Sequence, residues 1–296
     1  MFLMYVNDLP NASDIVSFIL FADDTNLFLA SNDQINVSTL LNDELQKVNS
    51  WFLANKLLIN FSKTSYMIFK PKNKRIDENL INVSIDNNHI NKVTSVKFLG
   101  VRIDSKLLWK EHINDISLKI SSITGVLNRL KFILPLPVLL KLYNSMILPF
   151  LTYCNIIWGK CASYLLQKLF LLQKRAIRII TKSPYIAHTN ELFTKLKILN
   201  IFKLHSYFVG SFMFSFVNNM VPQPFSDYFT LNSNINHYVT RNSDKFYVPN
   251  YRYNFSRAMI KYKGPVLWNS IPDNVKCSPS LYLFKQKYKF HLINSQ

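Results

Sequence analysis

Two adjacent aspartates, Asp23 and Asp24, separate two apolar runs near the start of the chain, and no other feature restricts its fold as strongly. The flanking residues, 18–22 and 25–30, are mostly aromatic, branched or otherwise apolar. Two such runs around a short polar break predict antiparallel strands joined by a tight turn. The paired carboxylates are therefore expected at the tip of a β-hairpin.

A pair of carboxylates on a turn suggests a metal site, because two like charges side by side repel unless a cation shares them. Mg²⁺ is a hard ion that takes one or two carboxylates together with substrate phosphates. In two-metal phosphoryl transfer, ions roughly 3.5–4 Å apart stabilise the attacking and leaving oxygens. The alternative is a solvated Asp-Asp-Thr turn without a ligand, since a dipeptide is a weak motif.

Residues 21–25, Phe-Ala-Asp-Asp-Thr, resemble catalytic motif C of the reverse transcriptases of non-LTR retrotransposons. Three other segments resemble that family in the same order along the chain. Residues 2–10 resemble the segment that follows motif B, residues 58–64 resemble motif D, and residues 98–101 resemble the turn that grips the primer strand. The resemblance continues to residues 267–272, so it covers nearly the whole chain.

The resemblance implies an α+β fold, with a partial right-hand polymerase palm followed by a mainly α-helical thumb and C-terminal region. The palm part would hold a β-hairpin, a helix and short antiparallel strands. The implied activity is that of an RNA-directed DNA polymerase using two-metal nucleotidyl transfer. The resemblance also assigns roles: metal binding and catalysis to Asp23 and Asp24, protonation of the leaving pyrophosphate to Lys63, and a primer grip to Phe98, Leu99 and Gly100.

The chain departs from that family at its start, because the fingers, motif B and motif A with a third metal-binding aspartate precede the point where Met1 falls. We therefore expect the C-terminal part of such an enzyme, with weak binding of Mg²⁺ or Mn²⁺ and no activity alone. The expected partners are an RNA template and a DNA primer or other nucleic acid, with a deoxynucleotide as the small-molecule substrate. The alternatives are a non-catalytic nucleic-acid-binding protein and a vestigial transposon product that folds poorly.

Charge divides the chain into three expected domains. Residues 1–105, the partial palm, have a net charge of −1; residues 106–206, a basic helical thumb or connection, +12; and residues 207–296, a basic aromatic region, +7. Clustered Lys and Arg side chains favour binding to a phosphate backbone through counterion release. A basic surface kept for solubility, or lysine drift in an A/T-rich genome, would give the same composition.

Hydrophobic periodicity predicts the coarse layout. Apolar residues at three- and four-residue steps predict helices over residues 37–52, 113–130, 138–147 and 164–180, the second ended by Pro135 and Pro137. Strands are expected at residues 64–69 and 96–103, with a short hairpin at residues 83–90. Beyond Pro222 the spacing is irregular.

Basic residues interleaved with apolar or aromatic ones mark the candidate nucleic-acid contacts. The helix over residues 164–180 can bury one face and offer the other to phosphates. Further on, Tyr alternates with Arg or Lys at residues 251–253 and 261–263, a pattern that suits stacking of single-stranded bases and equally suits a packed aromatic cluster. The candidates are Lys168, Lys174, Arg175, Arg178, Arg241 and Arg252.

Other sequence features indicate the cellular compartment in which the protein is expected. The three cysteines, Cys154, Cys161 and Cys277, lack zinc-site spacing and are expected to be free, mostly buried thiols. No leader peptide is recognisable, and the uncharged stretches 142–159 and 204–226 are better explained as buried helices than as membrane spans. The expected location is intracellular, either nuclear or cytoplasmic.

Overall fold

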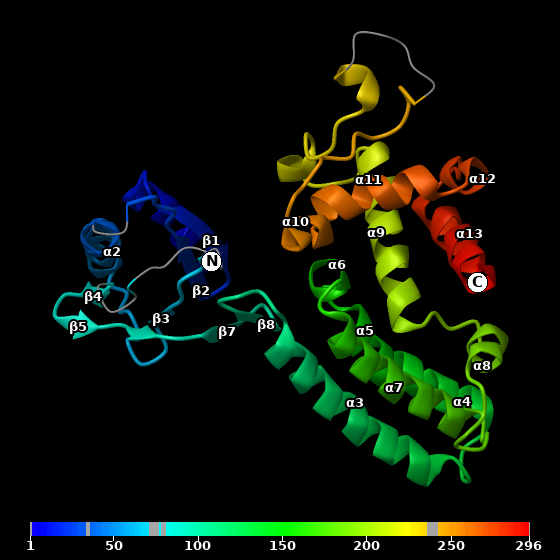
Figure 1. Ribbon diagram of the computed structural model, residues 1–296. Helices are drawn as coiled ribbons and strands as arrows, with labels where there is room; N and C mark the ends of the chain where they lie inside the picture. Colours follow the sequence, from blue (N-terminus) through cyan, green and yellow to red (C-terminus); the bar gives the residue numbers. More distant parts are fainter. Residues whose placement is uncertain (1, 34–35, 71–76, 78–80, 236–241, 296) are drawn as a thin grey trace. The chain divides into compact units, whose positions relative to one another are not determined.

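The computed structural model describes residues 2–33, 36–70, 77, 81–235 and 242–295. The chain forms two compact units, Met1–Leu107 (unit 1) and Leu108–Gln296 (unit 2), which are coloured blue to teal and green to red in Figure 1. Unit 1 combines short strands with one long helix, whereas unit 2 is helical. This mixture agrees with the expected α+β class.

Unit 1 begins with two short helical turns, α1 (Phe2–Tyr5) and η1 (Leu9–Ala12), followed by the predicted hairpin. Its strands are β1 (Ser17–Phe21) and β2 (Asp24–Phe28), in antiparallel register from Ser17 opposite Phe28 to Phe21 opposite Asp24. Among the described residues, β1 and β2 pair only with each other. The hairpin prediction is confirmed.

Helix α2 (Val37–Ala54) confirms the predicted amphipathic helix of unit 1. Its Leu45 is buried in a small core with Val83, Ile85 and Ile90, and Leu27 of the hairpin packs against this cluster. The helix is capped at its C-terminus by Asn55, and Lys56 has a positive φ of 56° that turns the chain out of the helix. The hairpin and the helix are thus joined through one apolar cluster.

The remaining strands of unit 1 are shorter than predicted. The strand expected at 64–69 is only β3 (Ser65–Tyr66), which pairs in parallel with β6 (Asn91–Lys92), although antiparallel pairing was expected. The hairpin expected at 83–90 is confirmed as β4 (Ser84–Ile85) and β5 (Asn88–His89). The single strand expected at 96–103 is instead a hairpin of β7 (Ser95–Phe98) and β8 (Val101–Asp104), because both residues between the strands have positive φ.

The first half of unit 2 is a group of packed helices. Helix α3 (Lys110–Leu130) packs along α7 (Ser163–Ile180), and both match the predicted helices (Figure 1). Between them lie α4 (Leu136–Leu142), the π-helical segment η3 (Tyr143–Ile147), α5 (Leu148–Thr152) and α6 (Asn155–Trp158). Pro135 caps α4, so the predicted interruption after α3 is confirmed.

The second half of unit 2 is built around α9 (Ile201–Val217), a largely buried helix that packs against both α11 (Ile260–Ser270) and α13 (Leu281–Asn294), as Figure 1 shows. The prediction missed α11 and α13. Shorter elements complete the chain: α8 (Asn190–Lys195), η4 (Gln223–Phe225), η5 (Asn232–Asn234), α10 (Asn254–Ala258) and α12 (Asp273–Lys276). Stacked and tilted rings of Phe214, Trp268, Phe284 and Tyr288 fill the space between α9, α11 and α13.

Neither stretch that was weighed as a membrane span forms one long apolar helix. Residues 142–159 are divided among several short helical segments, and α9 ends at Val217. Over the described ranges, no helix combines the length and apolar character needed to cross a bilayer. The three cysteines are free as predicted, but Cys277 is exposed and the other two are only half-buried.

Candidate functional site

The paired aspartates lie at the tip of the first hairpin. The loop between β1 and β2 consists of two residues, Ala22 and Asp23, and Asp24 opens β2 opposite Phe21. Both aspartates are exposed to solvent. Their position agrees with the sequence-based prediction, and nothing in the described hairpin covers them.

The turn that holds the aspartates is strained at Ala22. Two-residue hairpin loops need a positive φ at their first residue, which favours Gly or Asn, yet Ala22 adopts a φ of 52°. A residue with a Cβ in this region costs about 1–2 kcal/mol. Strained backbone of this kind gathers at functional sites, where the surrounding structure maintains it. Ten other non-Gly residues of the described chain also have a positive φ, so the strained turn supports the tip as a candidate site only together with its paired carboxylates.

The donor set of this tip suits a hard cation but is small. Asp23 and Asp24 together offer four carboxylate oxygens, the ligand type that Mg²⁺ prefers. No group of three or more His, Cys, Asp or Glu side chains that could hold a metal ion occurs within the described part of the chain. The pair fits one side of a metal site whose other ligands would be water, substrate phosphates or further carboxylates.

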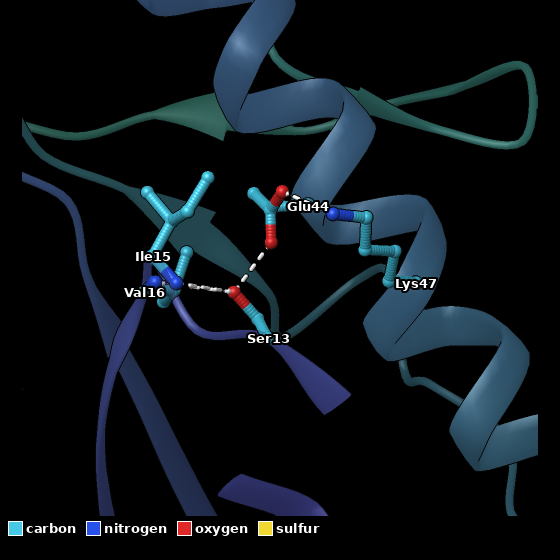
Figure 2. A network of polar contacts seen from close by, with 5 residues as sticks. All are labelled: Ser13, Ile15, Val16, Glu44 and Lys47. Carbon is cyan, nitrogen blue, oxygen red and sulfur yellow. Dashed lines mark hydrogen bonds and ion pairs between the residues drawn. The ribbon is translucent and has the colours of Figure 1, made fainter. Parts of the chain in front are cut away.

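A buried polar network anchors the entry to β1, as Figure 2 shows. The Ser13 hydroxyl accepts hydrogen bonds from the backbone N–H groups of Ile15 and Val16, at 3.2 and 3.1 Å, and donates one to the carboxylate of Glu44. Glu44, on α2, also accepts a hydrogen bond from Lys47 Nζ at 2.6 Å. This network ties the segment before β1 to α2.

The charge state of Glu44 follows from these partners. Hydrogen bonds from Lys47 and then Ser13 lower the pKa of Glu44 below its ordinary value, and burial only partly opposes them. Glu44 is therefore ionised at neutral pH. The prediction missed this network, although the sequence contained one signal. Glu44 stands on the apolar stripe of α2, three residues after Leu41 and four residues before Val48.

The other predicted palm residues lie in separate turns of unit 1. Lys63 is exposed in a turn closed by the hydrogen bond from its N–H to the Asn60 carbonyl at 3.1 Å. Phe98 ends β7, and Leu99 and Gly100 form a two-residue turn with φ values of 45° and 83°. These turns belong to different elements from the β1–β2 hairpin, so their roles in one site remain predictions.

The predicted basic contacts on α7 are mostly engaged within unit 2. Lys168 Nζ donates to Asn114 Oδ1 at 2.8 Å, and Lys174 lies over the Phe170 ring at 4.9 Å. Arg178 donates to the Ala187 carbonyl at 3.0 Å and lies over Tyr185. Arg175 and Arg252 are exposed. Arg241 lies outside the described residues. The exposed pair can meet a phosphate directly, whereas the engaged cations also stabilise the fold.

Comparison with known proteins relates the chain to transposon polymerases. It is 23% identical over 209 residues to the RNA-directed DNA polymerase from mobile element jockey of Drosophila melanogaster, a match of 66% of this chain and 22% of that protein. It is 22% identical over 212 residues to the probable RNA-directed DNA polymerase from transposon X-element of the same species, covering 68% and 23%. The probable polymerase from transposon BS is 24% identical over 182 residues, covering 60% and 20%.

The matched region spans about a fifth of the length of these curated relatives. No family model matches the chain. No solved structure matches it either.

Proposed function

Because the chain is a relative of the RNA-directed DNA polymerases of non-LTR retrotransposons, we propose that its β1–β2 hairpin is the metal-binding turn of a reverse transcriptase palm. In this proposal unit 1 supplies part of the palm and unit 2 supplies the basic thumb and C-terminal region. The observation that carries it is the pair of exposed carboxylates, Asp23 and Asp24, at the two-residue turn of the hairpin, where the resemblance places motif C.

Asp23 and Asp24 would hold the metal in this proposal. When bound, Mg²⁺ or Mn²⁺ would activate the attacking primer oxygen and stabilise the leaving phosphate oxygens. Asp23 projects from the loop itself and Asp24 from the first position of β2, so the hairpin register sets the spacing of the two carboxylates. We propose that two exposed carboxylates hold the ions only weakly, and that polymerisation needs further ligands besides this pair.

The remaining roles are proposals of the same kind. Lys63 would place an ammonium near the charge that develops on pyrophosphate. The turn at Leu99 and Gly100 would approach the primer strand closely, since Gly adds no side chain there. RNA template and DNA primer would meet unit 2, where the positive charge is concentrated.

Thermal melts with and without metal test the proposal. Mg²⁺ or Mn²⁺ should raise the melting temperature of the parent chain, because a ligand that binds only the folded state stabilises it. The double variant Asp23→Asn/Asp24→Asn should lose this metal response. Without metal it should be at least as stable as the parent, since the substitution removes repulsion between two carboxylates.

A matched control variant removes the same number of negative charges elsewhere in unit 1. Asp14 and Asp43 are exposed acids of the same unit, so Asp14→Asn/Asp43→Asn removes two charges away from the hairpin and should keep the metal response. A metal-free loss of stability in the hairpin variant would show that Asp23 and Asp24 are structural. If metal changes the melting temperature of none of these proteins but nucleic acid still binds, the non-catalytic alternative is favoured.

A further inference from the structure

Aromatic side chains supply four of the eight residues that line a pocket in unit 2. Its volume is about 340 Å³, and its walls include Tyr228, Phe229, Tyr247 and Tyr251, with Pro249 and Lys261 beside them. We propose that this pocket binds one unpaired base of a single-stranded nucleic acid, with Lys261 contacting the attached phosphate. The class of ligand rests on the proposed function, but the site is far along the sequence from the aspartate hairpin and has its own test.

The pocket has a preformed frame. Phe229 is buried and makes edge contacts with Tyr228 and Phe216, at 5.2 and 4.9 Å between ring centroids. The chain segments on its two sides are joined by the hydrogen bond from Tyr247 N–H to the Thr230 carbonyl, at 2.8 Å. The Asn269 side chain bonds both the N–H and the carbonyl of Phe246 next to the pocket. These contacts hold the described walls around Phe229 and Tyr247 in place.

The size and walls of the pocket suit one nucleotide. Small-molecule pockets run from roughly 300 to 1,000 Å³ and are mostly apolar with a few polar groups, so this volume lies at the small end. Every base has a π-face that can stack on an aromatic ring, whatever its sequence. Tyr247 is 43% exposed, which leaves its ring available for such stacking. Burial, and secondarily the nearby Tyr251, raises the pKa of Tyr228, so this phenol stays protonated and can donate a hydrogen bond.

The positive charge of Lys261 indicates which class of ligand the aromatic pocket can accept. Lys261 Nζ lies 5.4 Å from the centroid of the Tyr228 ring, and it is the one charged side chain among the described residues that line the pocket. Aromatic cages also bind quaternary ammonium groups, but here a lysine already occupies the ring face and would repel a second cation. A neutral base joined to an anionic phosphate satisfies both the rings and the ammonium. The exposed Arg252 follows Tyr251 and adds a cation for the next phosphate.

Oligonucleotides with and without a base test the pocket in the full-length chain. The probe is a short single-stranded oligonucleotide whose only base is a central 2-aminopurine, compared with a fully abasic strand of the same length and charge. The base-containing strand should bind at least about fivefold more tightly, the low end for stacking of one base, and its fluorescence should be quenched. Tyr247→Ala and Tyr251→Ala should each reduce this preference, and the double variant should abolish it.

Controls separate the pocket from general charge. Tyr253 is 69% exposed and lies two residues from Tyr251 outside the pocket lining, so Tyr253→Ala should keep the base preference. Lys261→Gln should weaken both strands equally and reduce the salt slope of log K by about 0.7, the value for one phosphate contact on a single strand. Because Tyr247 is half-exposed, its replacement by alanine should leave the fold intact, and circular dichroism checks this.

The outcomes also distinguish this inference from the proposed function. Equal affinity of the parent for both strands would overturn the base pocket while leaving the nucleic-acid partner in place. A preference that survives in the Tyr247→Ala/Tyr251→Ala variant would overturn it too, because the base would then bind elsewhere. If neither strand binds at low salt, both the pocket and the nucleic-acid partner are overturned, whatever the metal response of the hairpin.

Discussion

Unit 1 and unit 2 differ in how much apolar side chain they bury. Among the described residues, nine buried hydrophobic side chains belong to unit 1 and thirty-three to unit 2, although unit 2 is less than twice as long. The β1–β2 hairpin even leaves Ile19, Phe21 and Phe28 about half-exposed. Since burial is the main favourable term in folding, unit 2 should be the more stable of the two.

The two units also differ in charge. Residues 1–107 contain 11 basic and 11 acidic residues, whereas residues 108–296 contain 24 and 6, so the whole net charge of +18 lies in unit 2. The neutral unit presents the paired carboxylates, and the basic unit presents the aromatic pocket. A cation would be repelled by a strongly basic surface and a phosphate attracted to it, so this division is compatible with the proposed metal site in unit 1 and the proposed phosphate contacts in unit 2.

The largest expected effect comes from the buried amide of Gln173 in unit 2. Its Nε2 donates to the Tyr143 hydroxyl at 2.8 Å and the Leu199 carbonyl at 3.0 Å, and its Oε1 accepts from Ile201 N–H at 3.0 Å. Gln173→Ala would leave three buried polar groups without these partners and open a cavity, lowering the free energy of unfolding of unit 2 by about 3–5 kcal/mol. Urea unfolding with hydrogen exchange read peptide by peptide measures this loss and assigns it to a unit.

An exposed glutamine on the same helix provides the control for Gln173. Gln167→Ala changes the same side chain of α7 at the surface and should stay within about 0.5 kcal/mol of the parent. If Gln173→Ala were equally mild, unit 2 would not depend on the exact fit of its interior. The contrast between a densely packed unit and a loosely packed one would then fail.

A pair of glycines gives the next effect and tests packing directly. A Cβ on Gly210 of α9 would lie 2.4 Å from Tyr288 Cε1, and that ring is buried against Tyr207 and Phe284. Gly210→Ala should therefore destabilise unit 2 by about 1–3 kcal/mol, the usual cost of overpacking. Thermal or urea unfolding measures it.

Gly125 of α3 is the matched control for Gly210. Nothing lies within 4 Å of a Cβ built at this position. Gly125→Ala should raise stability by about 0.4–1 kcal/mol, because alanine loses less conformational freedom in a helix. Equal effects at the two glycines would show that α9 and α13 can separate without cost, contrary to the packing of unit 2.

The sequence predicted those elements whose signal is local. The hairpin follows from two apolar runs around a short polar break, and α2, α3 and α7 follow from apolar residues at helical spacing. Helix α13 was missed because polar residues, Lys285 to Lys287 and Lys289, interrupt the apolar spacing and hide its buried side. That side is defined by Phe284, Tyr288 and Leu292, whose burial depends on contacts with α9.

The same limit applies to the candidate sites. The position of Asp23 and Asp24 at a turn was predicted, because a two-residue break between apolar runs is itself a turn signal. The aromatic pocket was not, since Tyr228 and Lys261 are 33 positions apart and meet only through the packing of the chain. Alternation of aromatic and basic residues indicated a binding role, but it could not show which rings share a wall.

The smallest expected effect lies in unit 1, at Glu44, and it appears as a pH dependence. The pKa of Glu44 is held below its ordinary value of 4.5 by hydrogen bonds from Lys47 and Ser13, so the stabilisation is present above that value and is lost as the pH falls through the lower pKa of the folded state. Glu44→Gln removes the titrating group. The parent should therefore lose more stability than this variant between pH 7 and pH 3, by on the order of 1 kcal/mol.

Hydrogen exchange of β1 and α2 peptides at several pH values measures this difference where it arises. The effect is small because the Lys47 side chain is 57% exposed, and water screens its interaction with Glu44. Asp43→Asn, at the exposed neighbouring position, should keep the pH response of the parent. A response that survives in Glu44→Gln would place the titrating group elsewhere. A loss as large as that of Gln173→Ala would show that a single polar network, rather than its few buried apolar side chains, holds unit 1 together.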